Sequence, residues 1–155
     1  MTIRRLAFGL AALGLAGLGL AAASPAGAAE AIKGFWRTQD GRSVVQITDC
    51  NTGICGLIAG LPDNPEITKD EHNPDESKRS RPICKLIIIS GFSQTSDTEW
   101  EDGTIYNPKN GKTYDADMEL KGPATLDLRG YIGITLLGET QTWTRVQPGS
   151  FKPCS

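Results

Sequence analysis

From residue 34 to residue 146, short strand-forming segments alternate with clusters of turn residues. The segments with the length and pattern of β-strands are residues 34–38, 43–48, 54–59, 84–90, 99–101 with 103–107, 112–120, 125–131 and 139–146. Turn sequences such as Asp40-Gly41 and Glu101-Asp102-Gly103 separate them. Evenly spaced short strands of this kind are typical of an antiparallel sandwich or barrel. We therefore predict an all-β domain of about eight antiparallel strands.

The segment 112–120 indicates which side chains face the interior. Tyr114 and Met118 belong to the apolar set of this segment, which alternates with Thr, Asp and Glu, and Leu126 and Leu128 continue the same pattern in the next strand. One face of these strands is therefore expected inside and the other in water. By contrast, the run from Leu86 to Ile89 is apolar on both faces, so we expect the preceding connector to cover its outer side.

The first 28 residues have the pattern of a secretory signal peptide. Two arginines precede an uncharged run from Leu6 to Ala23, and the small residues Ala26-Gly27-Ala28 follow in the form that a signal peptidase accepts. The competing interpretation is an uncleaved membrane anchor, because the run is nearly long enough to span a bilayer. The glycines in the run and its small-residue ending favour cleavage after Ala28. We predict an exported single domain of residues 29–155 that has no stable membrane insertion.

The four cysteines are even in number, and export makes disulfides permissible. Cys50 and Cys55 flank a turn sequence that can bring the two sulfurs together, which leaves Cys84 to pair with Cys154. The rival interpretation is a zinc site. It fits poorly, because the close pair is C-x4-C and the chain has one histidine, the distant His72. We expect two disulfides and no metal.

The connector, residues Leu61 to Pro82, is the one long irregular segment and holds the densest group of charged residues. A calcium loop starting at Asp70 would lack the glycine and the glutamate that such a loop requires. A short capped helix fits better, with Asn73 as N-cap, Pro74 at its first position and Glu76 at the capping-box position. We expect His72 to be a solvated loop residue.

Several short motifs spread over the predicted domain belong to one pattern. They are Gly34-Phe35-Trp36, Asp49-Cys50 with Cys55-Gly56, Asp70 to Asn73, Arg79-Ser80-Arg81-Pro82, Trp100 to Gly103, Ile105 to Pro108, Gly111 to Tyr114, Leu128 to Tyr131 and Gln141 to Arg145. Together they resemble the DUF2147 family of exported bacterial proteins, over nearly the whole mature chain. Lys85 departs from the family pattern, which has Gly at this position, and we expect its charged head to reach solvent.

The resemblance implies a fold similar to the lipocalin or calycin barrel, an up-and-down antiparallel barrel, here with one short helix in the connector. The residues support this independently, because Trp36 on the first strand and Arg145 on the last resemble the lipocalin pair in which an arginine packs over a tryptophan at the closed end. First and last strands are neighbours when an eight-stranded meander closes. We expect these two residues to form the barrel floor.

Two functions are compatible with such a barrel. In the first, Tyr114, Met118, Leu126 and Leu128 line a cavity for a small, largely apolar ligand in the periplasm or outside the cell. The same residues would equally suit a filled core. The chain's formal net charge of -2 argues against nucleic acid as a partner. We expect no cofactor and no catalysis, because the chain shows no nucleophile paired with a base.

The alternative function is an envelope protein-binding or structural module, an inhibitor or adaptor, with a filled barrel core. Its contact surface would be the charged part of the connector, with Asp70, Asn73, Arg79 and Arg81 as the contacting residues. An apolar patch near the connector would favour this partner hypothesis. An open mouth that leads to an apolar cavity would favour the ligand hypothesis.

Overall fold

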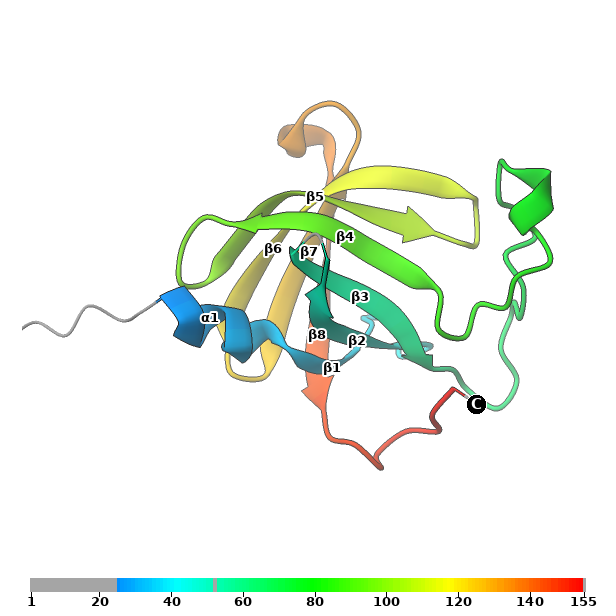
Figure 1. The fold of residues 1–155 in the computed structure, drawn as a ribbon, viewed down its shortest axis with the longest axis horizontal. Coiled ribbons are helices and arrows are strands. Elements are labelled where there is room, and N and C mark those ends of the chain that lie inside the picture. The colour runs from blue at the N-terminus through cyan, green and yellow to red at the C-terminus, as the bar shows by residue number, and fades with distance from the viewer. Residues whose placement is uncertain (1–24, 52, 155) are drawn as a thin grey trace, which may run out of the picture.

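A computed structural model describes residues 25–51 and 53–154 and shows a closed antiparallel β-barrel (Figure 1). Its strands are β1 (Gly34–Arg37), β2 (Val44–Cys50), β3 (Gly53–Gly60), β4 (Ile87–Gln94), β5 (Glu99–Asn107), β6 (Lys112–Gly122), β7 (Thr125–Tyr131) and β8 (Glu139–Val146). One α-helix, α1 (Pro25–Ile32), precedes β1, and two 3-10 turns, η1 (Glu76–Lys78) and η2 (Thr135–Leu137), lie in loops. Most of the predicted signal peptide lies outside the described residues.

Every strand pairs with the next in the chain, and β1 pairs with β8 to close the barrel. The closing register places Phe35 opposite Val146, Trp36 opposite Arg145, and Arg37 opposite Thr144. Short turns join most of the strands, as antiparallel neighbours allow. The predicted all-β, up-and-down barrel of about eight strands is confirmed.

The barrel has two different ends; in Figure 1 α1 lies on the left and the connector lies on the right. The closed end carries α1, the β2–β3 hairpin and the β6–β7 turn. The open end carries the β1–β2 loop, the connector, the β5–β6 turn and the β7–β8 loop. Between them lies a core in which all three tryptophans, Trp36, Trp100 and Trp143, are fully buried among aliphatic side chains.

Most strands lie within one or two residues of their predicted bounds, and the fourth and fifth strands differ more. The fourth strand begins at Ile87, not at residue 84, because Lys85 has a left-handed backbone with φ of 66° that interrupts extended structure. The fifth strand is continuous through Glu101 to Gly103, where a bulge with Asp102 at φ of 60° replaces the expected turn. Ile87 is 53% exposed, so the expected cover of the Leu86 to Ile89 run is incomplete.

Both predicted disulfides are present. The bond between Cys50 and Cys55 closes the β2–β3 hairpin, and the bond between Cys84 and Cys154 ties the C-terminal tail to the segment before β4. The tail also pairs with β3, since the Cys154 amide donates to the Ala59 carbonyl at 2.7 Å. The second bond spans 70 residues of sequence and therefore fixes one long loop of the chain.

The connector contains less helix than predicted. Its helical part is the single turn η1, and the N-cap is Asp75, whose carboxylate accepts a hydrogen bond from the Ser77 amide. Asn73 was predicted as the cap. Its side chain instead accepts the Asp75 amide and turns inward toward Asp70, so it is buried and fixes the bend before the helix.

Candidate ligand-binding site

A cavity of about 420 Å³ opens at the open end of the barrel. Its inner wall is largely aliphatic and aromatic, and the residues that form it are Ile58, Leu61, Ile67, Ile83, Ile88, Ile105, Tyr106, Tyr114, Leu128 and Trp143. Polar residues of the β1–β2 loop, the β5–β6 turn and the start of β8 surround the mouth. Its volume and lining are those of a site for one small molecule.

The connector forms part of the cavity wall. Leu61 and Ile67 of the connector, and Ile83 directly after it, contribute apolar side chains to the lining. The outgoing and returning parts of the connector are joined by an isolated antiparallel β-bridge between Lys69 and Pro82. A hydrogen bond from the Ile83 amide to the Thr68 carbonyl also joins them. The connector is therefore a folded cover over one side of the mouth.

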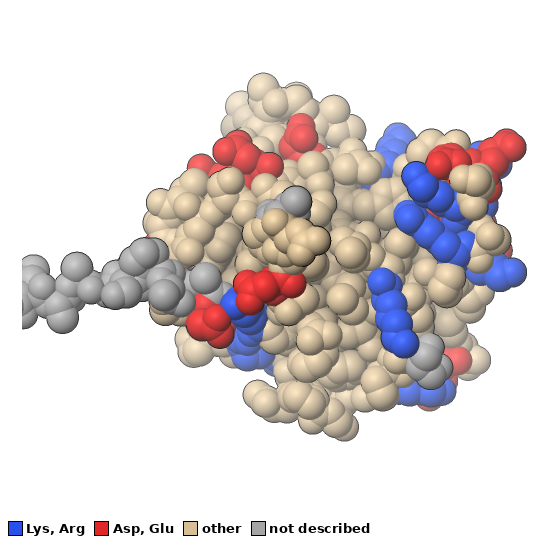
Figure 2. All heavy atoms as spheres, in the orientation of Figure 1, with Lys and Arg blue, Asp and Glu red and all other residues tan. Residues whose placement is uncertain are grey.

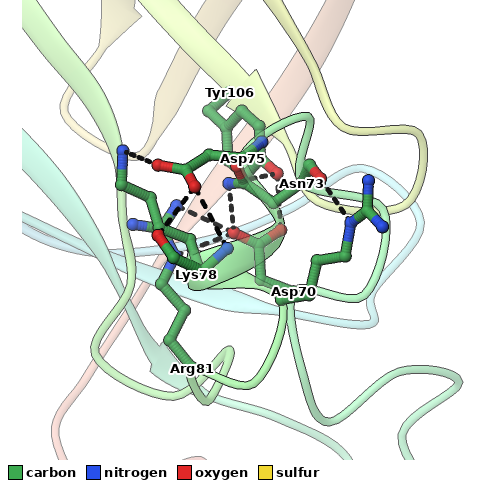
Figure 3. Close-up of polar contacts among 8 residues, drawn as sticks. Asp70, Asn73, Asp75, Lys78, Arg81 and Tyr106 are labelled. Carbon is green, nitrogen blue, oxygen red and sulfur yellow. Dashed lines mark hydrogen bonds and ion pairs between the residues drawn. The ribbon is translucent and has the colours of Figure 1, made fainter.

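A buried polar group, the Asp70 cluster of Asp70, Asn73, Arg81 and Tyr106, fastens this cover to the barrel (Figure 3). Asp70 is fully buried. Its carboxylate accepts the Tyr106 hydroxyl at 2.5 Å, the Asn73 amide at 2.7 Å and the Arg81 guanidinium at 2.8 Å. Tyr106 comes from β5 and the other three residues from the connector. Because each buried polar atom has a partner, the cluster is a structural attachment.

The environment of the Asp70 cluster shifts two pKa values. Burial acts to raise the pKa of the Asp70 carboxyl, but the hydrogen bonds from Tyr106, Asn73 and Arg81 outweigh it and hold that pKa below its ordinary value. Burial and the bond to Asp70 raise the pKa of the Tyr106 phenol. Asp70 is therefore ionised and Tyr106 protonated at neutral pH, which is the state that the hydrogen bonds require.

Exposed ion pairs cross the rim of the mouth. Glu66 of the connector accepts a hydrogen bond from Arg42 of the β1–β2 loop at 2.6 Å. Lys109 of the β5–β6 turn forms ion pairs with Glu66 at 3.3 Å and with Asp40 at 3.5 Å. Pairs this exposed contribute little stability. They do bring the three loops together above the cavity. On the face shown in Figure 2, Lys and Arg side chains gather over the side of the molecule that carries the connector.

The opposite end of the barrel is sealed. The Arg145 guanidinium lies 4.1 Å from the centroid of the Trp36 ring and donates to the carbonyls of Pro123 and Lys33 at 2.6 and 2.7 Å, and to that of Ala31. The Trp36 indole donates to the Ile32 carbonyl at 2.8 Å. The chain after the predicted cleavage site therefore covers the floor, and burial lowers the pKa of Arg145.

The structure divides the predicted cavity residues into two groups. Tyr114 and Leu128 line the cavity, whereas Met118 and Leu126 are buried in the core and take no part in its wall. The alternation of residues 112–120 correctly indicates an inward face. The alternation does not indicate at which residue of each strand the packed core ends and the cavity begins.

The predicted partner surface is divided in the same way. Asp70 and Asn73 are buried and present no surface, while Arg79 is exposed and Arg81 is half-buried against Asp70. His72 is exposed, as predicted. Lys85 is exposed too, as predicted, and its φ of 66° is a left-handed conformation that glycine adopts more readily.

Several residues of the cavity and of the Asp70 cluster have no counterpart in the sequence prediction. Ile105 could have been found, because it alternates with Gly103 on an expected strand. Leu61 and Ile67 are apolar residues in a charged connector, which is a usable signal that this segment covers the interior. The role of Tyr106 depends on a contact with Asp70, 36 residues away, and no local pattern indicates it.

In the part of the chain that the structure describes, no three His, Cys, Asp or Glu side chains gather into a set that could hold a metal ion. No described helix is both long enough and apolar enough to cross a membrane.

A closed eight-stranded meander with an apolar cavity at one end and an arginine over a tryptophan at the other is the architecture of a lipocalin-like barrel. Comparison of the sequence with protein families agrees with the resemblance seen in its motifs. The chain belongs to the family described as "Uncharacterized protein conserved in bacteria (DUF2147)", which matches residues 34–145. No curated protein sequence matches the chain.

Among solved structures, the barrel is similar to that of HP1028 from the human pathogen Helicobacter pylori, which is described as belonging to the lipocalin family. The TM-score is 0.69 at 23% sequence identity, over 76% of this chain and 84% of that one. At this identity the likeness shows a shared fold.

Proposed function

We propose that the protein is an exported binding protein that holds one small, largely apolar molecule in the cavity at the open end. The observation that carries the proposal is the cavity itself, about 420 Å³ of space that opens at one end of the barrel and has a largely aliphatic and aromatic inner wall. Small-molecule sites are commonly of this size and have mostly apolar walls with few polar groups. A barrel core filled throughout by side chains would leave no such space.

Two of the polar groups that line the cavity are oriented by hydrogen bonds within its wall. Asn110 donates to the Tyr114 hydroxyl at 2.9 Å, and the Trp143 indole donates to the Gln141 side-chain oxygen at 3.0 Å. The Tyr114 hydroxyl can still donate a hydrogen bond, and the Gln141 amide has free donors. The best-fitting ligand is therefore an apolar molecule with one hydrogen-bond acceptor, such as a carbonyl, ether or carboxylate oxygen.

Three features support export to the periplasm or the cell exterior. Residues 1–28 have the signal-peptide pattern, both disulfides need an oxidising compartment, and the family occurs in bacteria. Binding is favoured over catalysis, since the four cysteines are paired and His72 is exposed in the connector. The alternative of a partner-binding connector is less supported, because two of its four expected contact residues are buried.

Native mass spectrometry on the exported protein, purified without detergent, followed by organic extraction, tests this function directly. We expect an additional mass that leaves on denaturation, or uptake of a fluorescent apolar probe by the empty protein. A clean mass with no uptake of fatty acids or of apolar probes would contradict the proposal.

Two glycine-to-valine substitutions, one in the cavity and one outside it, supply a second test and its matched control. A side chain at Gly130 would meet Ile105 and Tyr114 at 3.6 and 3.7 Å, ordinary contact distances, so Gly130→Val fills cavity space without a clash at its Cβ. We expect Gly130→Val to reduce probe uptake about tenfold. Gly122→Val, where a Cβ meets nothing within 4 Å, should bind like the wild type.

A further inference from the structure

The β7–β8 loop, residues 132–138, exposes four large aliphatic side chains. Ile132, Ile134, Leu136 and Leu137 are 66%, 57%, 83% and 76% exposed. Within the described chain, the only other exposed large hydrophobic residue is Ile87 on β4, at 53%. Single exposed apolar residues are ordinary, but a contiguous group marks an interaction surface. In Figure 1 this loop, drawn in orange, projects beyond the strands of the barrel.

The loop has a defined shape that holds these side chains outward. Arg129 donates from Nε to the Thr135 carbonyl at 2.8 Å and from Nη2 to the Leu136 carbonyl at 3.3 Å. At the base of the loop, a Cβ on Gly138 would lie 2.7 Å from the Gly130 carbonyl oxygen, so no larger residue fits there. The exposure of the four side chains is therefore a property of the folded loop.

The backbone of the loop already satisfies much of its own hydrogen bonding. The Leu137 amide donates to the Ile134 carbonyl at 3.2 Å, and the Gly138 amide donates to the Thr135 carbonyl at 3.1 Å. The two carbonyls bound by Arg129 are satisfied as well. A backbone with internal partners loses less when water is removed, and this is the condition for contact with a lipid interior.

The chemistry of the loop fits a lipid surface better than a protein partner. Residues 130–138 contain no charged side chain, and the exposed group is purely aliphatic. The residues that dominate protein interfaces are Trp, Tyr and Arg, and a projecting tip would need a concave partner of matching shape. The boundary between lipid headgroups and acyl chains accepts an aliphatic tip without any matching shape.

The loop also lies on the rim of the cavity, since Gly130 before it and Glu139 after it both line the cavity. We propose that residues 132–137 insert into the interfacial region of a lipid bilayer and dock the open end of the barrel on the membrane. A docked barrel would face the membrane with its mouth and could exchange an apolar ligand with it. This exchange rests on the proposed ligand-binding function, whereas the docking does not.

Flotation of the purified protein with neutral phosphatidylcholine vesicles tests the docking. We expect the wild type to float with the vesicles, and to do so equally in high salt, because the loop carries no charge. The double variant Leu136→Ser/Leu137→Ser should lower the floated fraction roughly tenfold. Ile132→Ser/Ile134→Ser is an independent variant of the same loop with the same expected loss. The matched control is Ile87→Ser, an equally apolar exposed position on β4, which should float like the wild type.

Three results would overturn the docking. They are a wild type that stays in solution, a loss in Ile87→Ser as large as in the loop variants, and a wild-type dimer that both loop variants dissociate while the wild type does not float. The last would make the loop a contact between two copies of the chain. Uptake of an apolar probe by the loop variants in solution separates the two proposals, since it should remain at the wild-type level when flotation is lost.

Discussion

The guanidinium carbon of Arg145 lies 4.1 Å from the centroid of the Trp36 ring, across the seam where the last strand meets the first. The same guanidinium donates to carbonyls of the β6–β7 turn and of the segment before β1. One side chain thus joins the seam, a turn and the N-terminal segment at the closed end. The energetic coupling between Trp36 and Arg145 can therefore be measured to test whether the floor of the barrel is cooperative.

Trp36→Ala and Arg145→Ala should be strongly non-additive in the free energy of unfolding. We expect a coupling energy of about 0.5 to 2 kcal/mol, because each substitution alone already removes the cation–π contact. Urea unfolding of both single variants and the double variant gives this value. Arg145→Lys should recover little stability, since an ammonium group cannot reproduce the planar stacking and the forked hydrogen bonds. Additive losses would contradict a cooperative floor.

We expect the Asp70 cluster to make the folded protein less stable in acid. The pKa of Asp70 is lower in the folded protein than in the unfolded chain, so its ionised form stabilises the fold above about pH 4, and this contribution is lost as pH falls further. The pKa of Tyr106 is raised, so its contribution is present below about pH 10 and is lost as pH rises beyond that.

The substitution Asp70→Asn measures how much the ionised Asp70 carboxylate contributes to the free energy of unfolding. At neutral pH it should cost about 2 kcal/mol, because the neutral amide is a poorer buried acceptor for Tyr106, Asn73 and the half-exposed Arg81. The difference from the wild type should shrink as pH falls below about 4, as urea unfolding at a series of pH values would show. Asp75→Asn, at an exposed carboxylate whose pKa of about 2 comes from hydrogen bonds with Ser77 and Lys78, is the control and should cost much less. A pH-independent difference would contradict the assigned role of Asp70.

Lys85→Gly should stabilise the protein. Lys85 has φ of 66°, and a side chain in this left-handed conformation costs about 1 kcal/mol or more relative to glycine. The higher entropy of glycine in the unfolded chain offsets part of this, so we expect a gain of up to about 1 kcal/mol in thermal or urea unfolding. The Lys85 amide keeps its bond to the Ile58 carbonyl in the variant. Lys85→Ala retains the strain and should show no gain.

The two disulfides should differ in their contribution to stability. Loop-closure entropy gives about 4 kcal/mol for the Cys84–Cys154 bond, which spans 70 residues, and about 2 kcal/mol for the hairpin bond Cys50–Cys55. Replacing each pair by serines and measuring unfolding under oxidising conditions tests the order. Mass mapping of a non-reduced digest checks the pairing, and a peptide that links Cys50 to Cys84 would contradict it.

The strands and the hairpin disulfide could be predicted from the sequence because their signals are local. Alternation within residues 112–120 indicates the inward face of β6, and the turn between Cys50 and Cys55 sets that disulfide. The Trp36–Arg145 pair was implied by the resemblance to lipocalins, and closure of the meander is compatible with it because the first and last strands then become neighbours.

The sequence prediction failed where the position of a residue depends on contacts with residues far away in the chain. Asn73 is a residue type that commonly caps helices, but hydrogen bonds to Asp70 and Tyr106 hold it in a buried cluster. Asp75 caps the 3-10 turn η1 instead. The burial of Asp70 depends on a strand 36 residues away, which no local propensity describes.

The sequence alone therefore determined the strands, their inward faces and the hairpin disulfide, since each follows from alternation or turn chemistry. The Cys84–Cys154 bond followed by elimination, and the closed meander with its Trp36–Arg145 floor was implied by the resemblance to lipocalin-like barrels. Only the tertiary structure decided where the core stops and the cavity begins. Met118 and Leu126 are packed, whereas Tyr114 and Leu128 line open space. The physical reason is that alternation fixes the face of a side chain, while the room beside it depends on how all the strands and the connector come together in three dimensions.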